Sequence, residues 1–524
     1  MTHHQSRRSL GRSLAEAIRN KPAREVELKF TIPEKAVNAI GHKLGSRMAE
    51  GGPRHRHEVT TYFDTDDQAL SRIGISLRVR CSDGGYVQTL KANRKYGVAA
   101  NRAEWEWPVD ENKPDLNLVA QTPLAEKLPS GLDLVPVVST DIDRSVRVLE
   151  LDDGTRVEAA LDEGTIAAGE ARRPVHELEL ELRQGDPGPL FRWALELHAA
   201  VALTIESESK AERGYPLRND AKPAVQKAKD VALEPAVSAA VAFRDIVTAA
   251  LGHLLANQPA ALSGDAEGVH QMRVAIRRLR AALTLFEPHL EPHTASRFQT
   301  ELRRIGRVFG QARDWDVFSL QVLPDALDAA GAARWHELLR APAMAEQAAA
   351  HWRFAEEVRA PGFTALALGL AAWVEEGFTQ RGLLGDAALN RPIEDLAPIL
   401  LDRLMRKVRR RGRHIGRHSD AERHALRKSV KKLRYGIDYL RCVYRNESVD
   451  RYLHACKKLQ KTLGDLNDAV TATALADGLG RGNRPDLVPA LGALGKQLDQ
   501  QRQDGRRKLA KRWRMFRNRR KFWK

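Results

Sequence analysis

Charged residues at every second position recur through the first 220 residues, and their types suit the binding of phosphate and metal ions. The first such run is Glu25-Val26-Glu27-Leu28-Lys29-Phe30. Because successive side chains of a β-strand point to opposite faces, each run puts its charges on one face and its apolar residues on the other. Carboxylates bind hard divalent cations, and arginine and lysine bind phosphate oxygens. The pattern therefore favours a metal-bound polyphosphate, since Mg²⁺ is usually held by one or two carboxylates together with phosphates.

These alternating runs predict an N-terminal antiparallel β-sheet. For any single strand, the simplest interpretation is a sheet with one solvated face. The recurrence on at least six strands favours a closed barrel instead, in which the charged faces line a common interior. The later runs are Leu77–Arg80, Thr89–Lys91, Arg102–Trp107, Val157–Asp162 and Glu177–Glu181.

Seven segments in this part resemble the CYTH, or triphosphate tunnel metalloenzyme, superfamily. A single ExExK motif is weak evidence, but seven segments in the family's order between Glu25 and Tyr215 are specific. The resemblance implies an eight-stranded antiparallel β tunnel that binds a triphosphate through basic residues and hydrolyses it with Mg²⁺ or Mn²⁺. The segments are Glu25-x-Glu27-x-Lys29, Tyr62–Thr65, Leu77–Arg80, Thr89–Lys91, Leu161–Gly164, His176–Glu181 and Ser209–Tyr215.

The same resemblance assigns roles to individual residues. It implies that Glu25, Glu27 and Lys29 are catalytic. The implied metal ligands are Glu25, Glu27, Asp162, Glu177 and Glu179, and the implied phosphate ligands are Lys29, Arg78, Arg80, Lys91, Arg144 and Lys210.

Other charged positions fit the family's pattern less closely. The segment Asp141-Ile142-Asp143-Arg144 carries an acid where similar sequences often have a second basic residue. Glu106 and Glu181 are interpreted as solvated or paired residues at the rim. For Arg213 and Tyr215, bracing of the barrel's end is an alternative to a functional role.

Downstream of a linker that we place at residues 219–236, apolar residues recur every three or four positions, which predicts helices. This part also repeats itself. The eleven residues that begin at His270 recur from His424, 154 residues later, and a second block has the same displacement. We therefore predict two related helical units. In the second block, Arg303, Arg304, Arg307, Gly310 and Asp314 match Lys457, Lys458, Lys461, Gly464 and Asp468.

Each repeat has a stripe of basic residues along one helix face, called here its basic stripe, and a stripe of apolar residues on the opposite face. At about 3.6 residues per turn, the basic positions fall within an arc of roughly 80° and the apolar positions lie nearly opposite. A charge run is usually a solvated helix face, but like charges four residues apart destabilise a helix, so two copies of this pattern favour a bound polyanion. The apolar sets are Met272, Ile276, Leu279 and Leu283, and Leu426, Val430, Leu433 and Ile437.

Both repeats resemble the CHAD domain, an all-α module of two related units that binds inorganic polyphosphate and often follows a CYTH domain. The resemblance covers roughly residues 237–510. Arg313 corresponds to Asn467, so the two copies differ chemically. The histidine that begins each stripe is expected either to donate a hydrogen bond to phosphate or simply to pack. The implied polyphosphate-binding residues are His270, Arg273, Arg277, Arg280, Arg303, Arg307, His424, Arg427, Lys431, Arg434, Lys457 and Lys461.

Charge and composition separate the same two parts. The 524 residues carry a formal charge of +17, yet residues 1–230 contribute 34 basic and 36 acidic side chains, so the whole excess lies downstream. We expect an α+β fold of two domains. The predicted divisions are a tunnel domain at 20–218, a linker at 219–236, a helical domain at 237–510 with units of about 237–385 and 390–510, and a basic tail at 511–524.

Several classes of protein are disfavoured by the sequence. The apolar stretch Phe363–Val374 is too short to cross a bilayer and predicts a buried helix, so no transmembrane segment is expected. The N-terminus lacks the apolar core of a secretory signal. Cys81, Cys442 and Cys456 show neither a disulfide framework nor a zinc motif. We expect a cytoplasmic protein, associated with polyphosphate granules if it binds polyphosphate.

The function that the sequence favours is metal-dependent hydrolysis of inorganic triphosphate, with polyphosphate binding by the helical domain. One alternative is a non-catalytic polyphosphate-binding scaffold, and another is a tunnel enzyme that acts on thiamine triphosphate or ATP. The sequence shows no recognisable pocket for a base, which favours the inorganic substrate. Residues 505–524 combine 11 basic residues with four aromatic ones, so a polyanion-binding extension, nucleic-acid binding, an anionic membrane surface and a disordered tail all stay open.

Overall fold

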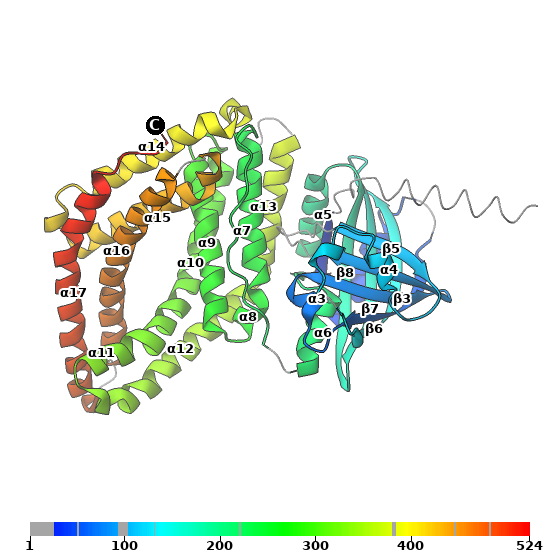
Figure 1. Cartoon of the computed structure of the whole chain (residues 1–524), viewed down its shortest axis with the longest axis horizontal. Helices are drawn as coiled ribbons and strands as arrows, with labels where there is room; N and C mark the ends of the chain where they lie inside the picture. Colours follow the sequence, from blue (N-terminus) through cyan, green and yellow to red (C-terminus); the bar gives the residue numbers. More distant parts are fainter. Residues whose placement is uncertain are drawn as a thin grey trace, which may run out of the picture. The chain divides into compact units, whose positions relative to one another are not determined.

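The computed structural model describes residues 26–49, 52–92, 103–129, 131–219, 222–379, 384–444, 447–480 and 484–523. The chain packs into two compact units (Figure 1). The first comprises the residues up to Gly185 together with Glu208–Ala221. The second comprises Asp186–Ser207 together with the residues from Lys222 onward.

The strands form one sheet in the order β5-β4-β3-β2-β6-β7-β8-β1-β9. The antiparallel sheet predicted from the alternating runs is confirmed. The predicted count of eight strands is wrong by one, because β9 has only two residues and is too short to show an alternating pattern. The strands are β1 (Glu27–Thr31), β2 (Arg54–Asp64), β3 (Ile75–Ser82), β4 (Gly85–Ala92), β5 (Ala103–Val109), β6 (Val135–Glu150), β7 (Arg156–Ala168), β8 (Ala171–Gln184) and β9 (Thr204–Ile205).

Short helices complete the first unit, and one of them fixes a corner of the sheet. Helix α6 packs against β6, β7 and β8, where Ala211 joins an apolar cluster with Tyr62 and Ile142. The Tyr215 hydroxyl donates to the buried carboxylate of Asp64 over 2.9 Å, which is the bracing role considered for Tyr215. The helices are α2 (Val37–Gly45), α3 (Ala69–Arg72), α4 (Leu116–Val119) and α6 (Lys210–Asn219), with 3₁₀ turns η1 (Glu34–Ala36) and η2 (Ala125–Lys127).

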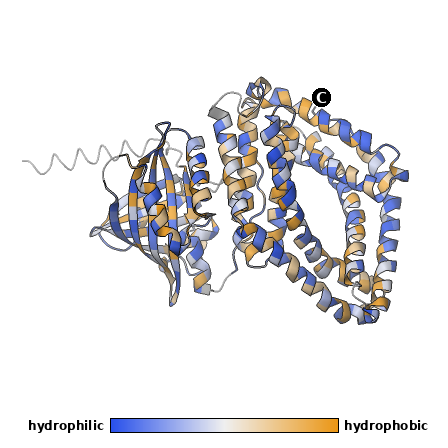
Figure 2. Cartoon of the chain, turned by 180° about the vertical axis from the view of Figure 1, so that it is seen from behind, coloured by the Kyte–Doolittle hydropathy of each residue, from blue (hydrophilic) through white to orange (hydrophobic). Residues whose placement is uncertain are grey.

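Apart from β9, the regular elements that the structure describes in the second unit are all helices, as predicted. Figure 2 shows hydrophobic and hydrophilic residues interleaved along its helices, which is the amphipathic pattern from which the helices were predicted. The helices are α5 (Pro187–Ala200), α7 (Ala239–Ala256), α8 (Gln258–Leu262), α9 (Ala266–Phe286), α10 (Pro292–Val317), α11 (Leu323–Ala329), α12 (His336–Arg359), α13 (Pro361–Thr379), α14 (Ile393–Arg411), α15 (Asp420–Leu440), α16 (Ser448–Leu479) and α17 (Val488–Arg517). A π-helical turn η3 (Phe318–Val322) and the 3₁₀ turns η4 (Ala333–Trp335), η5 (Ala387–Asn390), η6 (Ile415–Arg417), η7 (Arg441–Val443) and η8 (Pro485–Leu487) complete it.

The two repeats begin at equivalent helix caps. The Asp265 side chain accepts from the backbone N–H groups of Glu267 and Gly268 at the start of α9. Ser419, 154 residues later, forms a capping box with Glu422 at the start of α15. Each cap satisfies backbone donors that a helix start leaves unpaired. The duplication therefore extends to the signals that start both helices.

Helix α5 and the segment before α7 pack within the helical unit. Arg192 on α5 forms a 2.5 Å ion pair with Glu376 on α13. Residues 222–236, within the predicted linker, have no regular helix or strand, and the Gln226 N–H donates to the Asn257 side chain over 2.9 Å. The packing boundary thus differs from a simple cut along the sequence.

The predicted basic tail is not a separate segment. Helix α17 continues to Arg517, and the rings of Trp513, Phe516, Phe522 and Trp523 are buried. The Phe516 and Trp523 rings lie 5.6 and 5.2 Å from that of Tyr452 on α16. The interpretations of residues 505–524 as a disordered tail, or as a set of aromatic residues that stack on bases, are therefore wrong, because these rings form part of the core.

One stretch has the length and composition of a membrane span. Among the described residues, Ala239–Leu262 is the single helical stretch of this kind, and 61% of its most apolar window is buried inside the structure. Phe363–Val374 lies within α13 and is largely buried, as predicted.

Candidate active site and basic surface

The register of the strands gathers the predicted tunnel residues on one face of the sheet. Lys29 on β1 lies opposite Glu179 on β8, and Asp162 on β7 lies opposite both Arg144 and Glu177. Directly opposed residues of neighbouring strands share a face. The residues that share this inner face are Glu27, Lys29, Arg78, Arg80, Lys91, Arg144, Asp162, Glu177 and Glu179. Glu25 lies outside the described residues.

Three carboxylates on the inner face form a compact cluster. Asp162, Glu177 and Glu179 each offer an oxygen within 4.8 Å of the other two. The Lys210 ammonium, delivered by α6, lies 2.8, 2.6 and 3.1 Å from them, respectively. Arg144 lies 2.6 Å from both Asp162 and Glu179. Basic groups of the chain thus neutralise the cluster.

Glu179 and Lys210 both keep their charges at neutral pH. Burial raises the pKa of Glu179, but Lys210, Lys29 and Arg144 outweigh it and hold that pKa well below its usual range. Burial lowers the pKa of Lys210, and its acidic neighbours Glu179 and Asp162 raise it above its ordinary value. The group is therefore a network of ion pairs between charged residues.

The donor set of the cluster fits a hard divalent cation. Three carboxylate groups lie close together, and two of them, Asp162 and Glu177, are fully buried. Among the described residues, Glu177 Oε2 forms no hydrogen bond of good geometry, although Lys210 Nζ lies 2.6 Å away. Glu27 shares the face, opposite Glu181, but is not one of the three clustered carboxylates. Its metal-binding role stays a prediction.

A second part of the inner face carries more loosely paired cations. Arg78 lies 3.8 Å from Glu104, and Arg80 lies 3.5 Å from Glu58 and 3.4 Å from Glu106. Lys91 is closer, at 2.8 Å from Glu104. The pairing of Glu106 agrees with its interpretation as a paired rim residue.

Sequence reasoning missed two acidic neighbours of these cations. Glu58 and Glu104 were not among the predicted site residues, although Glu104 lies in an alternating run that marks its face. Glu58 lies on β2, between the exposed Arg56 and the buried Thr60 on the same face. Only the cross-strand register shows that it reaches Arg80 and Arg144.

The unusual acids of β6 point away from the inner face. His57 Nδ1 lies 2.9 Å from Asp143, and its Nε2 lies 3.4 Å from Asp141. These carboxylates raise the pKa of the exposed His57 imidazole. The hydrogen bond to Asp143 is the largest cause, and the charge of Asp141 is the next. Arg144 thus enters the inner face without an acid beside it on its own strand. Arg213, considered as a brace, pairs with the buried Glu177.

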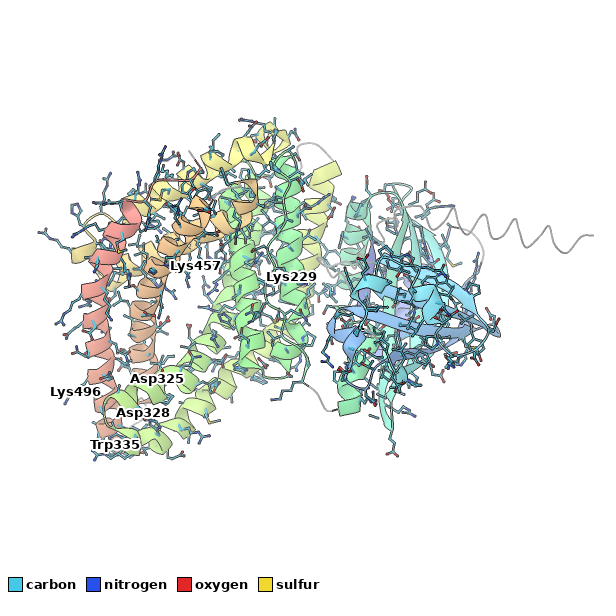
Figure 3. The ribbon with its side chains drawn as sticks, in the orientation of Figure 1. Lys229, Asp325, Asp328, Trp335, Lys457 and Lys496 are labelled. Carbon is cyan, nitrogen blue, oxygen red and sulfur yellow. The ribbon has the colours of Figure 1, made fainter. Side chains whose placement is uncertain are left out.

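In the helical unit, α9 and α15 present the two basic stripes. All eight predicted apolar positions of these helices are buried, which confirms their packing faces. Helices α10 and α16 add cations at Arg303, Arg307, Lys457 and Lys461, all exposed. Figure 3 labels Lys457 on α16.

Each repeat contains an ion pair at equivalent positions. Arg273 lies 3.6 Å from Asp314, and Arg427 lies 3.5 Å from Asp468, so both pairs join matching positions. The two pairs also affect each other. Burial raises the pKa of Asp314, and the nearby charge of Asp468 raises it further. The charges of Arg273 and Arg427 lower it. The stripes of the two repeats therefore meet and form one basic surface.

Burial and neighbouring arginines both disfavour the charged form of Lys431. Burial lowers its pKa to about 6, and Arg277, Arg427 and Arg273 lower it as well, whereas Asp468 opposes the shift. Most Lys431 side chains are then uncharged at neutral pH until an anion approaches. A bound polyanion would favour the charged form.

The two histidines that begin the stripes are also disfavoured as cations. Burial lowers the pKa of His270 to about 4, with Arg313 as the next cause. Burial lowers the pKa of His424 too, against the opposing hydrogen bond with Asn467. Both imidazoles are neutral at pH 7 in the free chain and can still donate one hydrogen bond each.

Comparison with known domain families identifies both parts of the chain. The CYTH domain model matches residues 23–215, and the CHAD domain model matches residues 245–477. An inorganic triphosphatase of Haemophilus influenzae is 32% identical over 204 residues, which are 38% of this chain and 56% of that protein. The chain thus spans about half the length of this curated relative.

Two solved structures are similar to parts of the chain. The CHAD domain from the plant Ricinus communis is 28% identical, with a TM-score of 0.49, and the match covers 57% of this chain and 98% of that one. A putative adenylyl cyclase from Hippeastrum with a dominant triphosphatase activity is 16% identical, with a TM-score of 0.26, and the match covers 35% and 90% of the two chains.

Proposed function

Residues 23–215 form a CYTH domain and residues 245–477 form a CHAD domain, and from this premise we propose that the chain hydrolyses inorganic triphosphate to diphosphate and phosphate and binds polyphosphate. One observation carries the proposal. A single face of the sheet gathers basic side chains around three clustered carboxylates, which is the chemistry of a metal-assisted phosphate site. The similarity to an inorganic triphosphatase supports the same reaction.

The loosely paired cations would bind the substrate. The guanidinium groups of Arg78 and Arg80 lie 3.4 to 3.8 Å from their carboxylate partners, so phosphate oxygens compete for them at little cost. Arginine donates two parallel hydrogen bonds to a phosphate group, which fix the orientation of that group. Its permanent positive charge also attracts the phosphate. Lys91 and Lys29 add positive charge on the same face.

Asp162, Glu177 and Glu179 would hold a divalent cation, either Mg²⁺ or Mn²⁺, which would supply Lewis-acid stabilisation of the developing charge. Lys210 and Arg144 neutralise these carboxylates in the free chain. With substrate bound, both groups would donate to the oxygens of the transferring phosphoryl group.

The low pKa of Glu179 fits a role in charge organisation. Burial raises the pKa of Glu179, but Lys210, Lys29 and Arg144 hold this pKa well below its usual range. Glu179 therefore stays ionised and is a weak proton acceptor. Phosphoryl transfer depends more on positioning and charge stabilisation than on a strong base. A water that attacks the terminal phosphorus would thus be positioned rather than strongly activated.

The lining of the inner face favours a small inorganic substrate. Its described residues are mostly charged or aliphatic, and its one aromatic ring, Tyr62, packs into the apolar cluster beneath α6. Trp105 and Trp107 alternate with Glu104 and Glu106 and so point to the other face. The described part of this face offers no stacking surface for a base.

Phosphate release from tripolyphosphate by the purified full-length protein tests the enzymatic proposal. We expect turnover with Mg²⁺ or Mn²⁺ that falls about 100-fold in Arg78→Ala, because one lost charge-stabilising donor costs on the order of 10²–10³ in rate. Arg72→Ala is the control, since Arg72 is exposed and pairs with Asp67. Glu27→Ala tests the predicted role of Glu27. Absence of phosphate release by the wild type with either metal would contradict the proposal.

A substrate panel separates the enzymatic alternatives. Tripolyphosphate, long polyphosphate, ATP and thiamine triphosphate are compared at equal concentration with each metal. We expect tripolyphosphate to have the highest kcat/KM. A higher value for ATP or thiamine triphosphate would assign an organic substrate.

The pairing of the clustered carboxylates with basic residues of the chain favours a second candidate function, in which the inner face binds polyphosphate without hydrolysing it. Because Lys210 and Arg144 already neutralise the cluster, the inner face can hold a polyphosphate chain without a metal ion. This candidate predicts binding that persists in EDTA and weakens with salt, with no phosphate release.

A further inference from the structure

The two halves of the basic surface differ in the kind of cation they carry. The α9–α10 half-site contains only arginines among its cations, whereas the α15–α16 half-site mixes arginines and lysines. The α9–α10 half-site is His270, Arg273, Arg277, Arg280, Arg303, Arg307 and Arg313, and the α15–α16 half-site is His424, Arg427, Lys431, Arg434, Lys457, Lys461 and Asn467.

The largest chemical difference lies beside the two histidines. In the α15–α16 half-site, Asn467 Oδ1 lies 2.5 Å from His424 Nδ1, so a neutral amide satisfies the imidazole. In the α9–α10 half-site, the equivalent residue is Arg313. Burial lowers the pKa of His270, and the charge of Arg313 lowers it further. Among the described residues, the buried His270 Nδ1 has no hydrogen-bond partner. The histidine of one half-site is therefore satisfied internally, whereas the histidine of the other has an unpartnered nitrogen, and that half-site carries an additional guanidinium.

The permanent charge of the half-sites differs in the same direction. The α9–α10 half-site has six arginines, which stay charged at any physiological pH. The α15–α16 half-site has two arginines and three lysines, and the pKa of Lys431 is lowered to about 6 by burial and by the surrounding arginines. Arginine also binds a phosphate group through two parallel hydrogen bonds, which lysine does not.

A polyphosphate chain has a matching asymmetry. An interior phosphate has one ionisable oxygen and carries one negative charge. A terminal phosphate has a second ionisation near pH 6, as in a phosphate monoester, so it approaches two charges at neutral pH. It also offers one more free oxygen. The end of the chain is therefore the part that gains most from an additional guanidinium.

We propose that the α9–α10 half-site binds the terminal phosphate of a polyphosphate chain through Arg313 and His270, while the α15–α16 half-site binds interior phosphates. The inference rests on the proposed binding of polyphosphate by the helical domain. Arg313 is then the residue that determines specificity for chain ends, and Asn467 marks the half-site that is indifferent to them.

Binding of two matched ligands by the full-length protein tests this assignment. One ligand is a polyphosphate of defined length with free ends. The other has the same length, but both ends are converted to phosphoramidates, which removes the second ionisation. Titrations are done in EDTA to prevent turnover. We expect the wild type to bind the free-ended chain about tenfold more tightly, as is typical of one additional charge-assisted hydrogen-bonded contact.

Reciprocal substitutions give the decisive comparison. Arg313→Asn should remove most of the preference for free ends and leave the affinity for the capped chain within about twofold, because only the end contact is lost. Asn467→Arg should strengthen binding of the free-ended chain. Arg353→Asn, an exposed position on α12, is the control for loss of one positive charge. Any end binding by the CYTH domain is common to all these variants.

The outcomes separate this inference from the proposed function. If neither ligand binds the wild type, polyphosphate binding itself is wrong. If both bind equally, or if Arg313→Asn weakens both ligands by the same factor, the assignment of the chain end to Arg313 is overturned while polyphosphate binding stands.

Discussion

Lys210 is the residue on which the carboxylate cluster depends in the free chain. Its ammonium lies within 3.1 Å of three carboxylates, and its side chain is only 9% exposed. Removing one partner of a buried ion pair leaves an uncompensated charge and costs about 3–5 kcal/mol. A divalent cation bound to the same carboxylates would replace part of the lost charge.

We therefore expect Lys210→Met to be strongly destabilised in EDTA and to recover more stability with Mg²⁺ or Mn²⁺ than the wild type does. Thermal denaturation with and without metal measures this difference. Lys43→Met, at an exposed position of α2, is the control and should respond to metal as the wild type does. An equal metal effect in Lys210→Met and the wild type would remove the cluster as the metal site.

The pH dependence of stability should report on Glu179. Burial raises the pKa of this carboxyl, but Lys210, Lys29 and Arg144 hold it well below the ordinary value of 4.5. The folded chain thus keeps Glu179 ionised at a pH where the unfolded chain takes up a proton. Its ion pairs stabilise the fold above about pH 4.5, and this contribution is lost as the pH falls toward the folded-state pKa.

Glu179→Gln should consequently flatten the loss of stability in acid. Denaturant midpoints measured at a series of pH values below 4.5 should fall more steeply for the wild type than for Glu179→Gln. Parallel curves for the two proteins would show that Glu179 does not contribute in this way.

At the scale of elements, helix α17 is the clearest case in which the structure changes the interpretation of the sequence. Its basic and aromatic composition resembles a nucleic-acid-binding segment, yet its aromatic side chains point into the helical core. Phe516 is fully buried and contacts Tyr452, whereas its neighbour Met515 is 44% exposed.

These two neighbours form a matched pair for mutation. Phe516→Ala should reduce the free energy of unfolding by about 3–5 kcal/mol, the usual cost of truncating a buried Phe. Met515→Ala should change it by less than about 1 kcal/mol, because the side chain is partly solvated. Urea denaturation of the full-length protein measures both. A small effect of Phe516→Ala would mean that residues 505–523 do not pack as the structure shows.

Local periodicity explains which elements could be predicted. The alternating strands and the stripes of α9 and α15 follow from spacings of two and of three to four residues, which are visible in any short window. The duplication made the helical stripes more secure, because the same pattern occurs twice.

Contacts between distant residues explain what could not be predicted from spacing. The approach of Lys210 to Asp162 joins residues 48 apart, and only the family resemblance indicated that both belong to one site. The burial of Trp523 depends on Tyr452 and Asp402, which a composition count does not reveal. The pairing of Glu58 with Arg80 likewise needed the strand register.

At the scale of the whole molecule, the charge has two different arrangements. Residues 1–230 balance 34 basic against 36 acidic side chains, and on the sheet those charges meet as close ion pairs. The helical unit carries the excess as repeated stripes with few acids to balance them. The net charge of +17 is thus a property of one unit, and salt should weaken polyanion binding by that unit.

The way the chain divides by packing predicts the stability of helical fragments that begin at different residues. Helix α5 lies within the span of the CYTH match, yet it packs against α13 in the helical unit. Besides the ion pair of Arg192 with Glu376, His198 Nε2 lies 2.8 Å from the carbonyl oxygen of Pro361. A helical fragment that begins at residue 222 would lose these contacts and expose the face of α13 that α5 covers.

We therefore expect a fragment of residues 186–524 to be more stable than a fragment of residues 222–524. Loss of a packed helix exposes apolar surface, and each buried side chain of that surface contributes on the order of 1.5–3 kcal/mol. Urea denaturation followed by circular dichroism compares the two fragments. Arg192→Ala in the longer fragment separates ion pairing from packing, and it should cost less than about 1 kcal/mol because Arg192 is 53% exposed. Equal stability of the two fragments would place the boundary of the helical unit after α5, because α5 would then add nothing to the fold of that unit.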